Sequence, residues 1–314
     1  MAVAAMRGID NIPMGNAPGE SEPICLQRFG RLCADACQRG WHEANGGNLS
    51  YRLDAADVAS FGSALVDGGE WHALGNPVPE LSGERFLMSA SGAYLSNVIH
   101  DVSRCCGVIE LDESGNAWRR CWGFDDDARP SSELETHLAI YVAALQAGDG
   151  ADRIVYHAHC PNVIALSTLL DPDARVWTRT LWRCMTEGII VFPRGIGVVP
   201  WMVPGGSELA RATRDFMDGH EACVWTQHGA IARAANFDTA FGTIDTIEKS
   251  AGIYLRARAA NGGNEPSHLV SDDQLRAICV RYGLHPDDDF LEGDSCSETL
   301  SHLLFARYSF GPLS

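Results

Sequence analysis

Three histidines, His157, His159 and His228, have the residue type and the sequence setting of metal ligands. The first two stand two residues apart in the apolar segment 154–160, which is typical of a buried strand. Because side chains two residues apart share one face of a strand, both imidazoles can reach one ion. The third ends another apolar segment and precedes Gly229, where the backbone can approach closely. Three neutral imidazoles around Zn²⁺ would leave an open position, as in catalytic zinc sites.

Histidine pairs of this spacing also occur by chance, so two hydrogen-bonded histidines on a half-buried strand are the alternative interpretation. The convergence of His228 on the same place is what would favour the metal site. The remaining histidines are scattered, and for each of them we expect a surface or a satisfied core position: His42, His72, His100, His137, His220, His268, His285 and His302.

Glu133 is the candidate acid–base residue. It follows Pro130, Ser131 and Ser132, and Ser131 is expected to act as the N-cap of a helix over 131–145. Glu133 would then lie in the first turn, where free N–H groups and the two serine hydroxyls could hold an anion. Two interpretations stay open at this point. The carboxylate could cap the helix, or it could exchange a proton with a group that the metal polarises.

Two further turns of small polar residues, 45–48 and 89–92, each adjoin an expected strand. Their glycines permit close approach of the backbone, while Asn and Ser side chains donate hydrogen bonds to anionic oxygens. Each turn alone is a weak signal, since Asn-Gly-Gly is first of all a turn sequence. Neither a Walker A loop nor a Gly-x-Gly-x-x-Gly fingerprint occurs, so the sequence does not support nucleotide binding.

Composition and charge exclude several classes of partner. The chain of 314 residues has 24 basic and 41 acidic side chains and a formal net charge of −17, which repels nucleic acids and anionic membranes. Lys249, the only lysine, shows none of the surroundings that Schiff-base chemistry needs. Eleven cysteines without a Cys-x-x-Cys pair predict reduced thiols. With no secretory signal and no apolar stretch of membrane-spanning length, we expect a cytoplasmic protein.

Strand and helix patterns alternate along the chain and predict one α/β domain over residues 25–286, between an N-terminal arm (1–24) and a C-terminal tail (287–314). The expected strands cover 48–53, 85–92, 107–111, 154–160, 189–192 and 222–229. The expected helices cover 24–39, 131–145, 162–170, 207–218 and 237–260, with an extra helix at 300–310. Segments 62–84 and 195–206 are expected to be irregular.

Taken together, these motifs resemble the class II aldolase/adducin family over residues 25 to 286. The resemblance is carried by Asn45-Gly-Gly-Asn48, Ser89-Ala-Ser-Gly92, Pro130-Ser-Ser-Glu133, Tyr156-His-Ala-His159, Phe192-Pro-Arg-Gly195, Pro200-Trp-Met-Val-Pro-Gly205 and Gln227-His-Gly229. Ser131 stands where relatives often carry Thr, and residues 42–44 depart from the more usual residues before the Asn-Gly-Gly turn.

The resemblance implies a three-layer α/β/α fold on a mixed, mainly antiparallel sheet, assembled as a homotetramer with sites near subunit interfaces. It implies one Zn²⁺ per subunit on His157, His159 and His228, with Glu133 as the catalytic acid–base residue. Glu187 matches a second carboxylate that helps with the aldehyde half of the substrate across the interface. The substrate phosphate would be held by Asn45, Gly47, Asn48, Ser91, Gly92 and Ser132.

The implied reaction is the reversible cleavage of L-rhamnulose 1-phosphate into dihydroxyacetone phosphate and L-lactaldehyde, a step of rhamnose catabolism. Cleavage beside a ketone leaves an enediolate, whose negative charge a metal ion can stabilise. Sister reactions are the alternatives: cleavage of fuculose phosphate, 4-epimerisation of a pentulose phosphate or dehydration of thioribulose phosphate. A non-catalytic scaffold like that of adducin is the alternative of another class, because fold alone does not fix function.

Overall fold

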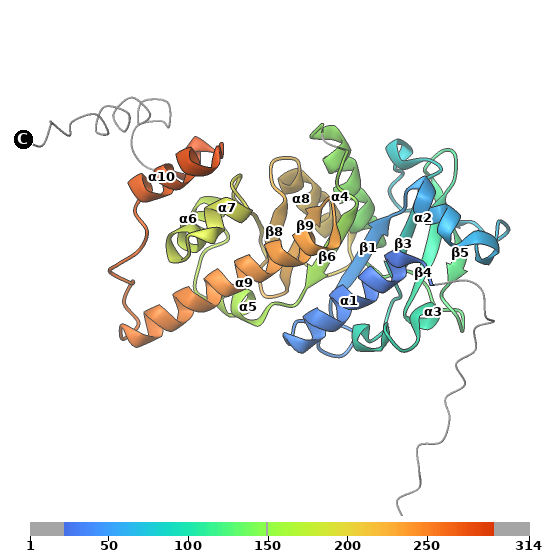
Figure 1. Cartoon of the computed structure of the whole chain (residues 1–314), viewed down its shortest axis with the longest axis horizontal. Coiled ribbons are helices and arrows are strands. Elements are labelled where there is room, and N and C mark those ends of the chain that lie inside the picture. The colour runs from blue at the N-terminus through green and yellow to red at the C-terminus, as the bar shows by residue number, and fades with distance from the viewer. Residues whose placement is uncertain (1–21, 149, 292–314) are drawn as a thin grey trace, which may run out of the picture.

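A mixed β-sheet runs through the centre of the computed structural model, which describes residues 22–148 and 150–291 (Figure 1). In these residues the sheet has nine strands in the order β2-β5-β4-β3-β1-β6-β9-β8-β7. They are β1 (Asn48–Arg52), β2 (His72–Ala73), β3 (Arg85–Ser89), β4 (Cys106–Leu111), β5 (Ala117–Gly123), β6 (Ile154–Ala158), β7 (Gly197–Val199), β8 (Ala222–Trp225) and β9 (Gly229–Ala234). Neighbouring strands are antiparallel, apart from the parallel pair β7 and β8. The expected mixed, mainly antiparallel sheet is confirmed.

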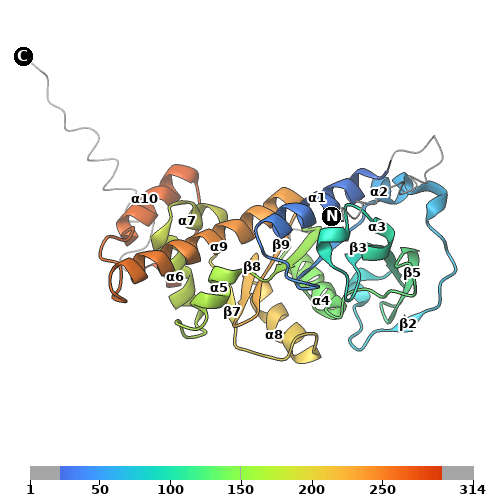
Figure 2. The same cartoon turned by 90° about the horizontal axis from the view of Figure 1, so that it is seen from below.

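Helices cover both faces of this sheet, with α1 and α9 on one side and α4 and α8 on the other (Figure 2). Their bounds are α1 (Ile24–Gln38), α2 (Ala55–Ser60), α3 (Val102–Cys105), α4 (Leu134–Gln146), α5 (Pro161–Leu166), α6 (Ala174–Cys184), α7 (Glu187–Val191), α8 (Ser207–Met217), α9 (Phe237–Ala260) and α10 (Asp272–Tyr282). The three-layer α/β/α architecture is therefore confirmed. In the part of the chain that the structure describes, no helix combines the length and apolar character needed to cross a membrane.

Strand β6 lies inside the sheet between β1 and β9, and all five of its residues are buried. Its side chains alternate between the two cores: Tyr156 packs in the core under α1 and α9, and Val155 in the core under α4 and α8. Since side chains two apart share a face, His157 points to the same side as Val155. The alternation thus directs this histidine to the face that α4 covers.

Helix α9 is the longest helix of the described residues and packs against β6 and β9 (Figure 1). It begins where the Asn236 side chain accepts a hydrogen bond of 2.9 Å from the N–H of Thr239, which satisfies a donor of the first turn. Buried residues at helical spacing, among them Ala240, Ile244 and Ile247, pack it against the sheet. The helix expected over 237–260 is confirmed.

Several expected elements differ from the structure. The segment 189–192 was expected as a strand, but residues 189–191 belong to helix α7 and Phe192 follows its end. A short apolar run fits a buried helix as well as a strand. The apolar segment 222–229 is split: β8 ends at Trp225, a turn follows, and Gly229 starts β9. Helix α5 ends at Leu166, short of the expected 170, and the irregular segment 195–206 contains the edge strand β7.

Besides β7 and α7, seven strands and α-helices were not expected from the sequence: β2, which lies in the segment 62–84 expected to be irregular, and β5, β9, α2, α3, α6 and α10. Both α6 and α10 begin at an N-cap side chain. Asp173 accepts a hydrogen bond from the N–H of Val176, and Ser271 accepts one from the N–H of Gln274. The ten cysteines in the described residues form no disulfide with one another. The expected helix at 300–310 and nearly all of the N-terminal arm lie outside the described residues.

Candidate active site

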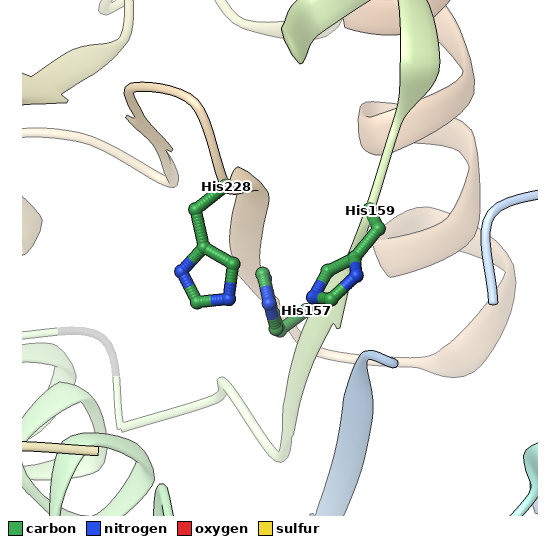
Figure 3. Close-up of side chains that lie close together, drawn as sticks. All are labelled: His157, His159 and His228. Atoms are coloured by element: carbon green, nitrogen blue, oxygen red, sulfur yellow. The ribbon is translucent and has the colours of Figure 1, made fainter. Parts of the chain in front are cut away.

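The end of β6 and the turn between β8 and β9 bring His157, His159 and His228 together (Figure 3). Strands β6 and β9 pair in antiparallel register with Ala158 opposite Ala230, so the end of β6 lies beside the start of β9. The ring centroids are 4.7 Å apart for His157 and His228, and 5.0 Å apart for each of the other two pairs. One nitrogen of each ring lies within 4.8 Å of one nitrogen of the others. Three imidazoles from two distant parts of the chain therefore converge on one small region, where their nitrogens could share one ion.

The hydrogen bonds of His157 leave one nitrogen available to a metal ion. Its Nδ1–H donates to the carbonyl oxygen of Ala230 at 3.0 Å, which fixes the tautomer because a carbonyl can only accept. The Nε2 atom is buried and has no hydrogen-bond partner among the described residues. A buried nitrogen with a free lone pair costs stability unless something coordinates it. This orphaned nitrogen, in a set of three imidazoles, fits the donor preference of Zn²⁺.

Burial also keeps His157 and His228 in the neutral form that binds metals. Burial, together with the nearby rings of His228 and His159, holds the pKa of His157 well below its usual value. Burial and the neighbouring His159 lower the pKa of His228 to about 4. Trp225 packs over both rings, with centroid distances of 4.5 Å to His157 and 5.1 Å to His228. Its indole forms an apolar wall on one side of the histidines.

A carboxylate that the sequence analysis did not single out orients His159. The Nδ1–H of His159 donates to Oε1 of Glu43 at 2.6 Å. Glu43 belongs to the same turn as Gly46, whose N–H donates to the Glu43 carbonyl at 2.7 Å. Carboxylates commonly hold metal-binding histidines in this way. The only sequence signal for Glu43 is its place just before Asn-Gly-Gly, and that signal does not specify the contact.

Glu133 lies immediately before α4, which begins at Leu134, and not in the first turn of the helix as expected. Its side chain makes no capping hydrogen bond. Instead Oε2 accepts a hydrogen bond of 2.8 Å from Nδ2 of Asn48, and Oε1 lies 4.0 Å from Nε2 of His228. The residue is 5% exposed. Burial raises the pKa of its carboxyl above the usual value, although the hydrogen bond from Asn48 acts in the other direction.

The turn 45–48 packs tightly against the end of β6. A Cβ on Gly46 would lie 2.6 Å from Nδ1 of His159, and one on Gly47 would lie 2.8 Å from the carbonyl oxygen of His157. Gly47 also has φ +73°, a conformation that favours glycine. Both glycines are thus required for the backbone to approach the histidines. The turn places Asn45 and Asn48 at the edge of the same site.

The turn 89–92 lies beside the turn 130–133, which contains Glu133. The N–H of Ser91 donates to the carbonyl of Arg129 at 2.8 Å, and the N–H of Ser131 donates to the carbonyl of Ser89 at 2.9 Å. The Ser89 hydroxyl in turn accepts from the N–H of Leu49 on β1 at 3.1 Å. The small polar turns that the sequence analysis singled out are therefore neighbours in the fold. A cleft of about 500 Å³ opens beside them, lined in part by residues 129–132, 205 and 206.

Comparison with known proteins agrees with this arrangement. Residues 27–255 match the family described as Class II Aldolase and Adducin N-terminal domain. Rhamnulose-1-phosphate aldolase from Enterobacter sp. (strain 638) is 38% identical over 85% of this chain and 96% of its own length. The protein of the same name from Escherichia coli O81 (strain ED1a) is 37% identical over 83% of this chain and 94% of its own.

The chain belongs to the class II aldolase and adducin family. The resemblance stated from the motifs is confirmed, and so is the expected class of enzyme, an aldolase-type lyase. Among solved structures, the sugar-phosphate aldolase from Thermotoga maritima has a TM-score of 0.65 at 24% identity, covering 77% of this chain and 97% of its own. That likeness shows the shared fold. Class II aldolases are metal-dependent, and the three histidines form a group that could hold an ion.

The other residues that the family resemblance singled out lie in two places. Glu133 and the turns with Asn45, Asn48, Ser91 and Ser132 adjoin one another near the histidines. Glu187 is separate: it is exposed and starts α7, which packs against α6, α9 and α10. Within the described residues, no hydrogen bond or ion pair joins its side chain to the histidines. Its role across a subunit interface stays a prediction.

Proposed function

We propose that this chain is a zinc-dependent aldolase that reversibly cleaves L-rhamnulose 1-phosphate into dihydroxyacetone phosphate and L-lactaldehyde, as a step of rhamnose catabolism. The observation that carries the proposal is the convergence of three imidazoles beside the buried carboxylate of Glu133. The substrate is inferred from the relatives at 37–38% identity, which carry the name rhamnulose-1-phosphate aldolase.

His157, His159 and His228 are proposed to hold one Zn²⁺ per subunit. When bound, the ion stabilises the negative charge that develops beside the substrate carbonyl as the carbon–carbon bond breaks. The chain prepares the ligands in three ways: Ala230 fixes the tautomer of His157, Glu43 orients His159, and Trp225 excludes water from one side. Rigid, neutral ligands reduce the cost of binding the ion.

Glu133 is proposed to exchange the proton at the substrate carbon next to the carbonyl. In the cleavage direction its carboxyl gives a proton to that carbon, and in the synthetic direction its carboxylate removes it. Burial suits it to both tasks, because a raised pKa brings the protonated and ionised forms closer in free energy at neutral pH. The hydrogen bond from Asn48 holds Oε2, so Oε1 is the oxygen that faces His228.

The substrate phosphate is proposed to bind at the three polar turns, through Asn45, Gly47, Asn48, Ser91, Gly92 and Ser132. Neutral N–H and O–H donors can hold a phosphate without a cationic side chain. This matters in a chain with a net charge of −17, where the overall field repels anions. The contacts that join the turns 89–92 and 130–133 keep their donors in a fixed arrangement.

The homotetramer and the part of Glu187 in handling the aldehyde remain predictions from the family resemblance. The cytoplasmic location remains a prediction from the sequence. The domain boundaries at residues 25 and 286 also remain a proposal. The matched segment, 27–255, lies within them.

A direct test compares cleavage of L-rhamnulose 1-phosphate and L-fuculose 1-phosphate, together with synthesis from dihydroxyacetone phosphate and L-lactaldehyde. We expect cleavage and synthesis of the rhamnulose compound, lost on removal of zinc with a chelator and restored when zinc is returned. A preference for the fuculose compound would replace the substrate but keep the chemistry. A purified protein with stoichiometric zinc and no carbon–carbon bond chemistry would overturn the proposal.

A further inference from the structure

A buried chain of hydrogen bonds leads away from the carboxylate of Glu133 into the core beneath α4. It runs from Glu133 to Asn48 on β1, then to His137 on α4, and on to the hydroxyl of Ser50. Asn48, Ser50 and His137 are each 6% exposed or less. The proposed reaction uses Glu133 and a free N–H of Asn48, but it assigns no task to His137.

The orientation of the Asn48 amide determines whether its NH₂ group or its oxygen faces the Glu133 carboxylate. The shape of the amide alone does not fix this orientation. Its oxygen and its NH₂ group have nearly the same shape, so only hydrogen-bond partners determine which end faces the carboxylate. An ionised carboxylate can only accept, so it requires the NH₂ end at Oε2. The amide oxygen must then face the other neighbour, which is Nε2 of His137.

The amide oxygen also accepts only, so His137 has to carry its proton on Nε2. The ring is wholly buried, and burial lowers the pKa of His137 to about 3, so it is neutral and has a single N–H. Its Nδ1 must therefore accept, and the Ser50 hydroxyl lies 2.7 Å away to donate. Tyr141 lies at the far end of the chain: its hydroxyl is 3.0 Å from Ser50 Oγ and 3.1 Å from the carbonyl oxygen of Arg153. Because Ser50 gives its own proton to His137, the single proton of Tyr141 is shared between these two acceptors.

The opposite tautomer of His137 would exchange donors and acceptors along this series of hydrogen bonds. With the proton on Nδ1, His137 would donate to Ser50, and its Nε2 would need a donor. Asn48 would have to turn its NH₂ group to His137 and its oxygen toward Glu133, where two acceptors would meet. Such a contact repels an ionised carboxylate and leaves it without a partner in a buried place. One tautomer of His137 is thus tied to one orientation of Asn48.

We infer that His137 is a positioning residue: by donating from Nε2 to Asn48, it directs the Asn48 NH₂ group to Glu133 and holds the carboxylate beside the histidine cluster. The helix supports this arrangement, since Glu133 and His137 are four residues apart and the N–H of His137 donates to the Glu133 carbonyl at 3.0 Å. The inference rests on the proposed acid–base role of Glu133. It adds a residue on which the geometry of that group depends.

Two substitutions separate the two ends of the ring. In H137Q the side-chain amide takes the place of the Nε2 atom of the ring and can still donate to Asn48. In H137N the shorter side chain places its amide where Nδ1 was, so it reaches only Ser50. We expect H137N to lower kcat by about tenfold to 100-fold, more than it changes KM, as for a misplaced reacting group. H137Q is expected to lose clearly less. Y141F, which changes only the far end of the chain, serves as the control and should keep kcat.

A second comparison asks whether the effect passes through Glu133. In an E133Q background, H137N should lower kcat no further, because the carboxylate that His137 positions is gone. If E133Q keeps full kcat, the proposed function itself fails. If E133Q loses activity while H137N and H137Q both match the wild type, the proposed function stands and the inference about His137 is overturned.

A spectroscopic measurement tests the inference even if H137N does not fold. In the full chain labelled with ¹⁵N-histidine, the imidazole resonances of His137 are identified by their absence from H137Q. The expected result is a neutral ring with the proton on Nε2 at neutral pH. A proton on Nδ1, or a charged ring, would contradict the chain of donors and overturn the inference.

Discussion

Nε2 of His228 and Oε1 of Glu133 lie 4.0 Å apart, although the two residues come from a strand–strand turn and the start of a helix. The distance links the proposed metal ligands to the proposed acid–base group. A substrate held at the histidines is consequently within reach of the carboxylate. Both side chains depend on the sheet for their places, since His228 lies in the turn between β8 and β9, and Asn48, which holds Glu133, lies on β1.

Replacement of Glu133 by glutamine tests the acid–base role. We expect E133Q to lower turnover by about 100-fold or more, the usual contribution of a positioned acid–base group, and to retain the metal. The measurements are kcat for cleavage and zinc per chain. E135Q is the matched control: Glu135 lies two residues further on and faces Gly75 and Asn76. Equal turnover for E133Q and the control would remove Glu133 from the mechanism.

The contact between Glu43 and His159 predicts an effect on metal affinity. We expect E43A to weaken zinc binding by about 10- to 100-fold, because His159 loses the carboxylate that fixes its ring. E43Q should lose less, since its amide oxygen still accepts from Nδ1. Affinity is read from competition with a chromogenic chelator. D35A is the control, an exposed carboxylate on α1 paired with Arg31. If E43A binds zinc as tightly as D35A does, Glu43 does not support the site.

Alanine substitutions at two glycines with the same backbone conformation distinguish the cost of backbone strain from the cost of steric overlap. Gly40 has φ +74° and nothing within 4 Å of an added Cβ, whereas a Cβ on Gly47, at φ +73°, would overlap the ring of His42. G40A should therefore lose about 1–2 kcal/mol of unfolding free energy from the left-handed backbone alone. G47A should lose about 1–3 kcal/mol more, from overpacking. Urea denaturation measures both, and equal losses would show that the turn can move away from the histidines.

Stability at acid pH depends on His137. Its pKa falls from 6.5 to about 3 on folding, so the unfolded chain takes up this proton more readily than the folded one. The stability that comes from the neutral buried ring is complete above pH 6.5, and it is lost as the pH falls from 6.5 towards 3. We expect the unfolding free energy of the wild type to fall more steeply over this range than that of H137Q. Parallel curves for the two proteins would contradict the buried neutral ring.

The sequence predicted the convergence of the three histidines better than it predicted the elements around them. His157 and His159 follow from the alternation of a strand, and α9 from its long helical spacing. The strand expected over 189–192 was wrong because four apolar residues carry no period that separates helix from strand. Strand β9 was missed because the hairpin turn around His228 interrupts an apolar segment that reads as one strand.

The partners of the site residues could not be predicted, because they depend on contacts between distant segments. Glu43 reaches His159 across 116 positions of the chain, and Asn48 reaches Glu133 across 85. No local pattern encodes such contacts. His137 was expected at a surface or a satisfied core position, and it occupies a core one. Only the folded chain shows that its partner is the amide that faces Glu133.

The most direct test of the central claim is the zinc content of the purified chain and of its H157A, H228A and H100A variants. Zinc is measured by elemental mass spectrometry after dialysis against metal-free buffer. His100 is an exposed histidine away from the cluster and serves as the control. The account predicts about one ion per chain in the wild type and in H100A, and almost none in H157A and H228A. Full zinc content in H157A or H228A would contradict the claim that these imidazoles hold the metal.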